Sequence, residues 1–327
     1  MRDWLWTRLV LLFWLVANSA VWAQQTAKIP HIGYLDVPTA AADPDRVVAF
    51  RQGLRELGYI EGKNIVIEFR FADGKLDRLP ALAAELVRHR VDVIVTGGPT
   101  GTRAAKTATS TIPIVMSQDS DPVGNGFVAS LARPGGNITG LSSLNVDLAG
   151  KRLELLKEIL SKLERVAILG TSTSRSNLRQ QRETELAAAA FKVKIQYLDI
   201  LSSKDIEPVF KAASKERVDG VIQLAGPVVA AYLDELPRVA AKSRLPVMYY
   251  QSGFIEHGGL MSYGPHWRDL DRRAATYVDK LLRGAKAAEL PVEQPIKLEL
   301  AVNLKAARQI RLTIPPNVLA RADRVIR

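Results

Sequence analysis

The stretch VDVIVTGGP at residues 91–99 and the stretch VDGVIQLAGP at residues 218–227 are two versions of one pattern, and this pair decides the fold. Each has a short apolar run, typical of a buried strand, followed by Gly-Pro, where a helix would begin. The match continues in the same order through three further pairs of segments: 31–35 with 165–170, 64–72 with 191–200, and 112–118 with 245–251. Collinear copies of this length favour two similar domains over a short repeat unit. The alternative is that all parallel α/β units look alike.

Apolar strand-like runs alternate with helical patterns along the chain, which predicts an α/β protein with parallel sheets. We expect two similar doubly wound parallel-sheet lobes joined by a multi-strand hinge. The turn at Pro134 to Gly136, followed by the strand-like ITGLSS, is the expected first exit from the first lobe. The expected N-terminal lobe comprises residues 27–141 plus about 265–290, and the C-terminal lobe 142–264 plus about 291–327.

Residues 1–23 have the pattern of a cleaved export signal, with Arg2 and Arg8, an apolar run, and VWA before Gln24. The chain has no cysteine, so it carries neither a disulfide nor a lipid on cysteine. We therefore expect a soluble protein of the periplasm. The formal net charge is +11, but basic and acidic residues are interspersed, which indicates a solvated surface rather than a nucleic-acid site.

Candidate ligand-binding residues in the first half follow the predicted strands, because loops at the carboxyl ends of parallel strands meet at one edge of a sheet. Gly98 lets a ligand approach the backbone, and hydroxyls near a helix start suit a carboxylate or a phosphate, although simple capping is the alternative. Asp36 and Asp119 are candidate partners for a ligand ammonium. The first-lobe candidates are Tyr34, Asp36, Gly98, Thr100, Thr102, Ser117, Gln118 and Asp119.

The equivalent positions of the second half give hydroxyls, an apolar loop and aromatic rings. Tyr250 and Tyr263 either stack on a flat ligand or fill the core, and core packing is the expected role of Tyr249. The second-lobe candidates are Thr171, Ser172, Gly226, Gln251 and Tyr263.

Signals for catalysis are weak. The four histidines lack metal-ligand spacing, and there is no Gly-x-Ser-x-Gly, P-loop or Gly-x-Gly-x-x-Gly motif after the first strand. We therefore expect no catalytic residue, no metal and no cofactor.

Four segments together resemble the ABC-transporter substrate-binding family typified by tryptophan- and tyrosine-binding lipoproteins. They are residues 53–74, 112–142, 258–310 and 312–316, within which LARPGGN and LPVEQP are the most specific. The resemblance implies a type I periplasmic-binding fold. It also implies ligand-binding roles for Thr100, Thr102, Ser117, Asp119 and Tyr263. The chain departs from the pattern in QLAGPVV, in His266, and in its lack of a cysteine.

The leading functional hypothesis is the periplasmic solute-binding component of an ABC importer. It would capture a small carboxylate-bearing solute, an amino acid or an aromatic acid, between two lobes and deliver it, as a monomer, to a permease in the inner membrane. The alternatives are a periplasmic hydrolase that uses Asp119 and His266, and a ligand-binding partner of a sensory receptor.

Overall fold

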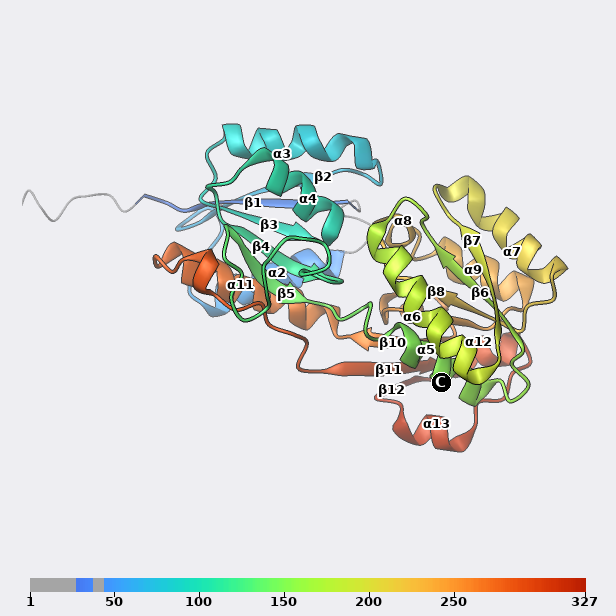
Figure 1. Cartoon of the computed structure of the whole chain (residues 1–327). Coiled ribbons are helices and arrows are strands. Elements are labelled where there is room, and N and C mark those ends of the chain that lie inside the picture. Colours follow the sequence, from blue (N-terminus) through green and yellow to red (C-terminus); the bar gives the residue numbers. More distant parts are fainter. Residues whose placement is uncertain (1–27, 38–43) are drawn as a thin grey trace, which may run out of the picture.

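The computed structural model describes residues 28–37 and 44–327, so the predicted export signal lies outside the described residues. The described residues form two α/β lobes that lie side by side, each built around its own sheet (Figure 1). This arrangement confirms the fold class predicted from the sequence. Within the described ranges, no helix is long and apolar enough to cross a membrane.

The first lobe contains a five-stranded parallel sheet with the strand order β2-β1-β3-β4-β5. Its strands are β1 (His31–Asp36), β2 (Val66–Phe71), β3 (Val93–Gly97), β4 (Ile114–Asp119) and β5 (Ile138–Ser142). Its helices are α2 (Pro44–Glu56), η1 (Leu76–Arg78), α3 (Leu79–Arg88), α4 (Pro99–Ala108), α11 (Trp267–Leu282) and η3 (Ala287–Glu289).

Alternate residues of β1 enter different cores of the first lobe because successive side chains of a strand point to opposite faces of the sheet. Ile32 and Tyr34 pack with α2 and α11 on one face. Leu35 packs with α3 and α4 on the other. Helix α11 packs along α2, although more than 200 residues of sequence separate the two helices.

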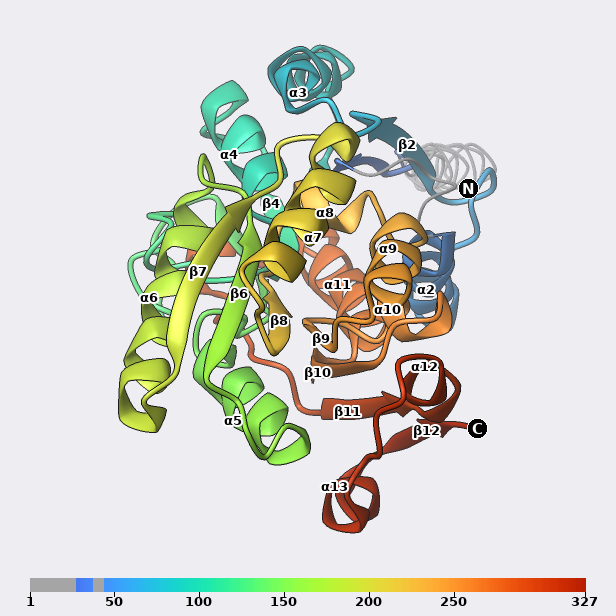
Figure 2. The same ribbon diagram turned by 90° about the vertical axis from the view of Figure 1, so that its right-hand side faces the viewer.

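The second lobe contains a seven-stranded sheet with the order β12-β11-β10-β9-β8-β6-β7. Its strands are β6 (Arg165–Gly170), β7 (Lys194–Asp199), β8 (Gly220–Gln223), β9 (Val247–Tyr249), β10 (Met261–Pro265), β11 (Leu298–Asn303) and β12 (Arg324–Ile326). Its helices are α5 (Ala149–Ile159), α6 (Arg175–Phe191), η2 (Ser203–Asp205), α7 (Ile206–Lys215), α8 (Pro227–Ala230), α9 (Glu235–Ser243), α10 (Gly253–Glu256), α12 (Leu304–Gln309) and α13 (Pro316–Arg321). Figure 2 shows α5 and α6 on one side of this sheet and α7 and α9 on the other.

The two sheets repeat one topology. Strands β7-β6-β8-β9-β10 have the same order and parallel direction as β2-β1-β3-β4-β5, and the repeated sequence segments form the matching strands. Strand β11 then pairs antiparallel with β10 and extends the second sheet. The repeat seen in the sequence is therefore a repeat of structure.

The chain crosses between the sheets three times: after β5, after β10 and before β11. The first and third crossings touch, because the amide of Ser142 donates to the carbonyl of Glu293. We propose these crossings as the lobe boundaries, and the residue ranges given from the sequence stay a prediction.

Candidate functional site

A cavity lies between the two lobes and is lined from both. Helix α11 supplies Trp267, and the crossing after β5 supplies Ser143 and Asn145. The full lining is Asp36, Arg46, Gly98, Pro99, Gln118, Ser120, Ser143, Asn145, Ser174, Ala225, Gly226, Pro227, Ala230, Tyr250, Gln251 and Trp267.

The first-lobe wall is built where parallel strands end. Asp36 ends β1, Gln118 lies at the end of β4, and Gly98 follows β3 and precedes α4. Gly98 has a φ of +92°, a left-handed conformation that glycine adopts without strain, and it lets Pro99 open the helix. The sheet topology therefore brings these three residues to one edge of the cavity.

Arg46, from the first turn of α2, is the cation of this wall and is buried. One terminal nitrogen lies 2.8 Å from Oδ2 of Asp36, and Nε donates to Oδ2 of Asp271 at 3.0 Å. Burial disfavours the cation, but the Asp271 and Asp36 carboxylates outweigh this effect and hold the pKa of Arg46 well above its usual value. When the Gln118 amide is oriented with its oxygen toward the guanidinium, that oxygen also accepts hydrogen bonds from Arg46. Arg46, Asp36 and Asp271 thus form a buried cluster of one cation and two carboxylates.

The lack of a side chain at Gly97 leaves the space that the Asp36 carboxylate occupies. A Cβ at residue 97 would lie 2.2 Å from Oδ2 of Asp36, closer than any real contact. The other carboxylate oxygen accepts from the amide of Val37 at 2.8 Å. Asp36 is therefore fixed by the backbone on one side and by Arg46 on the other.

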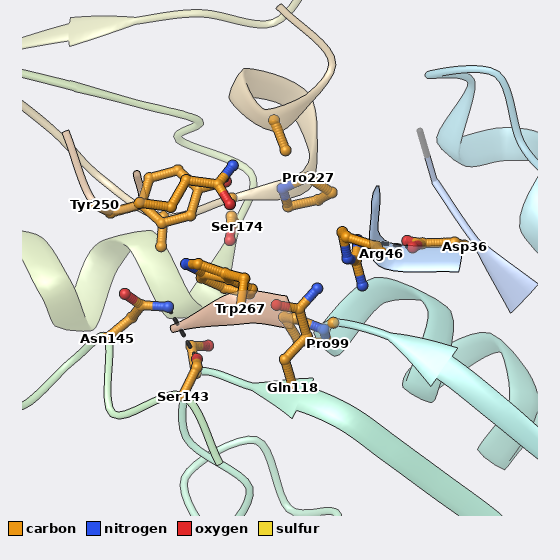
Figure 3. A pocket seen from close by; sticks show the side chains of 16 residues that line it. Asp36, Arg46, Pro99, Gln118, Ser143, Asn145, Ser174, Pro227, Tyr250 and Trp267 are labelled. Atoms are coloured by element: carbon orange, nitrogen blue, oxygen red, sulfur yellow. Dashed lines mark hydrogen bonds and ion pairs between the residues drawn. The ribbon is translucent and has the colours of Figure 1, made fainter. Parts of the chain in front are cut away.

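An aromatic wall lines one side of the cavity and is formed by Tyr250 of the second lobe and Trp267 of helix α11 in the first lobe. The Tyr250 and Trp267 rings meet edge to face with their centroids 5.6 Å apart. Pro227 faces them across the cavity, with Ser174 between (Figure 3). Gln251 donates to the Tyr250 hydroxyl at 3.2 Å. This side suits a flat apolar group.

Ser143 and Asn145 form a polar end of the cavity. In Figure 3 they lie on the opposite side of the view from Asp36 and Arg46. The Asn145 amide nitrogen donates to Oγ of Ser143 at 2.8 Å, and Arg152 lies behind Asn145. The cavity therefore has polar groups at both ends and an aromatic wall between them.

Five of the candidate residues predicted from the sequence line this cavity: Asp36, Gly98, Gln118, Gly226 and Gln251. The other eight do not line it: Tyr34, Thr100, Thr102, Ser117, Asp119, Thr171, Ser172 and Tyr263.

Three of these eight candidates use their hydroxyls within their own lobes: Thr102, Thr171 and Ser172. Thr102 Oγ1 lies 2.8 Å from Thr96 Oγ1 and donates to the Gly98 carbonyl. Thr171 donates to the Ile200 carbonyl. Tyr34 and Tyr263 pack in the hydrophobic cores. Tyr249 is also a core residue, as predicted.

Asp119 lies directly behind the first-lobe wall and is fully buried. Its Oδ1 accepts from the amide of Asp121 at 2.9 Å and from the side chain of Asn125 at 2.8 Å. Burial raises the pKa of Asp119 to about 6. This carboxylate organises the loop after β4.

Sequence reasoning missed Arg46 and Trp267, which begin helices rather than follow strands. Arg46 lies directly before the apolar residues of α2. This position is the only signal in the sequence that its side chain is buried. Trp267 lies beside His266, whose ring accepts from the amide of Asp269 as the N-cap of α11.

Among the described residues, no group of three His, Asp or Glu side chains is arranged to hold a metal ion.

Two similar α/β lobes around a cavity that both of them line define a bilobal ligand-binding protein of the periplasmic-binding type. The sequence model of the family "ABC transporter substrate binding protein" matches residues 42–326. The chain therefore belongs to the ABC transporter substrate-binding protein family.

Three relatives illustrate the similarity. A tyrosine-binding protein of Clostridioides difficile (strain R20291) is 25% identical over 255 residues, which are 78% of this chain and 73% of the relative. A crystal structure of a conserved domain protein from Vibrio cholerae has 28% identity and a TM-score of 0.86, covering 91% of this chain and all of that one. A structure from Streptococcus pneumoniae in complex with L-Trp has 24% identity and a TM-score of 0.81, covering 90% of this chain and all of that one.

Proposed function

We propose that this protein captures a small carboxylate-bearing solute with a flat apolar part, such as an aromatic amino acid or an aromatic acid, between its two lobes. The observation that carries the proposal is the lining of the cavity. Tyr250 and Trp267 form an aromatic wall, with polar groups at both ends. Ligand sites of this kind combine a largely apolar lining with a few fixed polar groups.

Contacts between the lobes support capture by closure. Oγ of Ser120 in the first lobe lies 2.5 Å from Oγ of Ser176 in the second. Lobes joined by a few crossings can rotate apart and close on a ligand. A ligand that contacts both walls would favour the closed arrangement, because it binds that arrangement better than the open one.

The biological setting is part of the same proposal. The export-signal pattern at residues 1–23 supports action in the periplasm, and membership of the family supports delivery to an ABC permease of the inner membrane. The L-Trp complex and the tyrosine-binding relative support an aromatic amino acid as the first ligand to test.

The test is a titration of the chain from Gln24, stripped of ligand by unfolding and refolding. Trp267 is the only tryptophan after residue 23, so its fluorescence, excited selectively, reports on the cavity itself. The panel is L-tyrosine, L-phenylalanine, 4-hydroxybenzoate and phenylacetate by fluorescence, with L-tryptophan and indole-3-acetate by calorimetry.

We expect saturable binding of at least one aromatic carboxylate without its consumption. A ligand at about 100 times its dissociation constant should also stabilise the folded protein by about 2.7 kcal/mol. Glycine and D-ribose serve as small and non-aromatic controls. Binding of ribose alone, or turnover of any compound, would contradict the proposal.

A further inference from the structure

Arg152 is a fully buried cation near the polar end of the cavity. It lies on α5, its side chain is among the largest that are fully buried, and no carboxylate among the described residues pairs with it. Burial lowers the pKa of Arg152 to about 9, and the Tyr250 and Tyr263 side chains act against this effect. An isolated buried charge is costly unless something of opposite sign comes near it.

The contacts of Arg152 are all to neutral oxygens. Its Nε donates to the carbonyl of Tyr263 at 2.8 Å. One terminal nitrogen donates to the carbonyl of Asn145 at 3.2 Å, and the other donates to Oδ1 of the Asn145 side chain at 2.6 Å. Arg152 therefore fixes both the backbone and the side chain of Asn145.

These contacts determine what Asn145 presents to the cavity. Since Oδ1 accepts from Arg152, the amide nitrogen of Asn145 must be on the other side, where it donates to Oγ of Ser143. An amide nitrogen carries two hydrogens, and Ser143 takes one of them. Asn145 lines the cavity, so the second hydrogen is available to a ligand there.

The Arg152 cation makes the Asn145 amide a stronger hydrogen-bond donor. A hydrogen bond from Arg152 polarises the Asn145 amide, and in a low-dielectric interior such a chain of hydrogen bonds favours negative charge at its far end. A ligand carboxylate beside Asn145 would supply the counter-charge that the protein itself does not place near Arg152.

We propose that Asn145 binds the ligand carboxylate directly and that Arg152 is the positioning residue behind it, so that the pair selects acids over neutral analogues. This inference rests on the proposed function, because it assigns the acid-binding end of the same cavity. It also assigns the aromatic part of the ligand to the wall formed by Tyr250 and Trp267.

The decisive variant is Asn145→Asp, which keeps the shape of the side chain. The new carboxylate would pair with Arg152, so the variant should unfold at a temperature no lower than the wild type. The same carboxylate would repel that of the ligand. The probes are L-tryptophan and its neutral amide, L-tryptophanamide, and the readout is the ratio of their dissociation constants by calorimetry.

We expect the wild type to prefer the acid and Asn145→Asp to lower that preference at least tenfold. Arg152→Met should lower it too, while Arg182→Met, which removes an exposed arginine of α6, should leave it unchanged. A purely structural role for Arg152 would weaken both ligands equally. An unchanged ratio in folded Asn145→Asp would therefore overturn the inference alone, whereas a wild type that binds no aromatic carboxylate of the panel would overturn the proposed ligand class and this inference with it.

Discussion

Nε of Arg179 lies 2.7 Å from Oδ2 of Asp121, and this ion pair joins the second lobe to the first. Arg179 lies on α6, and Asp121 lies in the loop after β4. The same guanidinium donates to the side chain of Asn125 at 2.6 Å and to the carbonyl of Gly124 at 3.2 Å. One arginine of the second lobe thus contacts three residues of one first-lobe loop, next to Ser120 at the cavity wall.

Replacing Arg179 with alanine should weaken ligand binding without unfolding either lobe, because its polar contacts all join the lobes. The pair is partly exposed, so solvent screens it, and the expected loss is about 1 kcal/mol, or roughly fivefold in the dissociation constant. Calorimetry with the ligand found by the panel measures the loss, and Arg182→Ala on the same helix is the control. Equal affinities in the two variants would show that this contact does not contribute to closure.

Gly97→Ala should disrupt the first-lobe wall, because the added Cβ would lie 2.2 Å from the Asp36 carboxylate. Displacing that carboxylate breaks its pair with buried Arg46, so we expect a loss of about 2 to 4 kcal/mol of folding stability and weaker ligand binding. Urea unfolding measures the first effect and calorimetry the second. Gly136→Ala is the matched control, because a Cβ there meets no atom within 4 Å and the change should stay within about 0.5 kcal/mol.

The sequence was enough to predict the fold, because buried parallel strands leave continuous apolar runs. All five residues of β3 are buried, and its counterpart β8 is equally apolar and buried. The repeated pattern then predicted two lobes with matching topology. Element ends were less accurate: the matched apolar segment 112–118 corresponds to β4, which begins at Ile114 and runs to Asp119, where its last residue still pairs with β5.

The site could be predicted only in part. Residues at the carboxyl ends of strands, such as Asp36 and Gly98, are placed by the sheet topology alone. Arg46 and Trp267 could not be predicted, since their positions depend on how α2 and α11 pack together. The hydroxyls of Thr102 and Thr171 turn away from the cavity because nearby backbone carbonyls accept their hydrogens. The sequence identifies the hydroxyl donors, but it does not show which backbone carbonyls compete with a ligand for their hydrogens.

Asp119 should make the stability of the protein depend on pH between about 4 and 6. Burial raises its pKa to about 6, above the ordinary value of 3.8, so the folded state takes up the proton first on acidification. The contribution of this group to the free energy of unfolding is therefore greatest below about pH 4 and is lost as the pH rises through 6. The difference between a pKa of 3.8 in the unfolded chain and about 6 in the folded protein corresponds to roughly 3 kcal/mol.

Asp119→Asn keeps an oxygen for the Asp121 amide but carries no charge. The variant should be more stable than the wild type at pH 7.5, by up to about 3 kcal/mol, and nearly equal to it at pH 4. Urea unfolding at several pH values measures the difference. A difference that does not change between pH 4 and pH 7.5 would show that Asp119 does not titrate in this range.

Arg46→Met should be among the most destabilising changes in the first lobe. It would leave the Asp36 and Asp271 carboxylates buried without their shared cation, and removing one partner of a buried pair costs about 3 to 5 kcal/mol. The two carboxylates would then take up protons more readily, so the loss should shrink as the pH falls from 7.5 to 5. Arg51→Met is the matched control on the same helix, because its pair with Glu61 is exposed and should contribute no more than about 1 kcal/mol. Urea unfolding of both variants at the two pH values makes the comparison. If Arg46→Met lost no more stability than Arg51→Met at pH 7.5, the buried cluster would not be what holds the first-lobe wall in place.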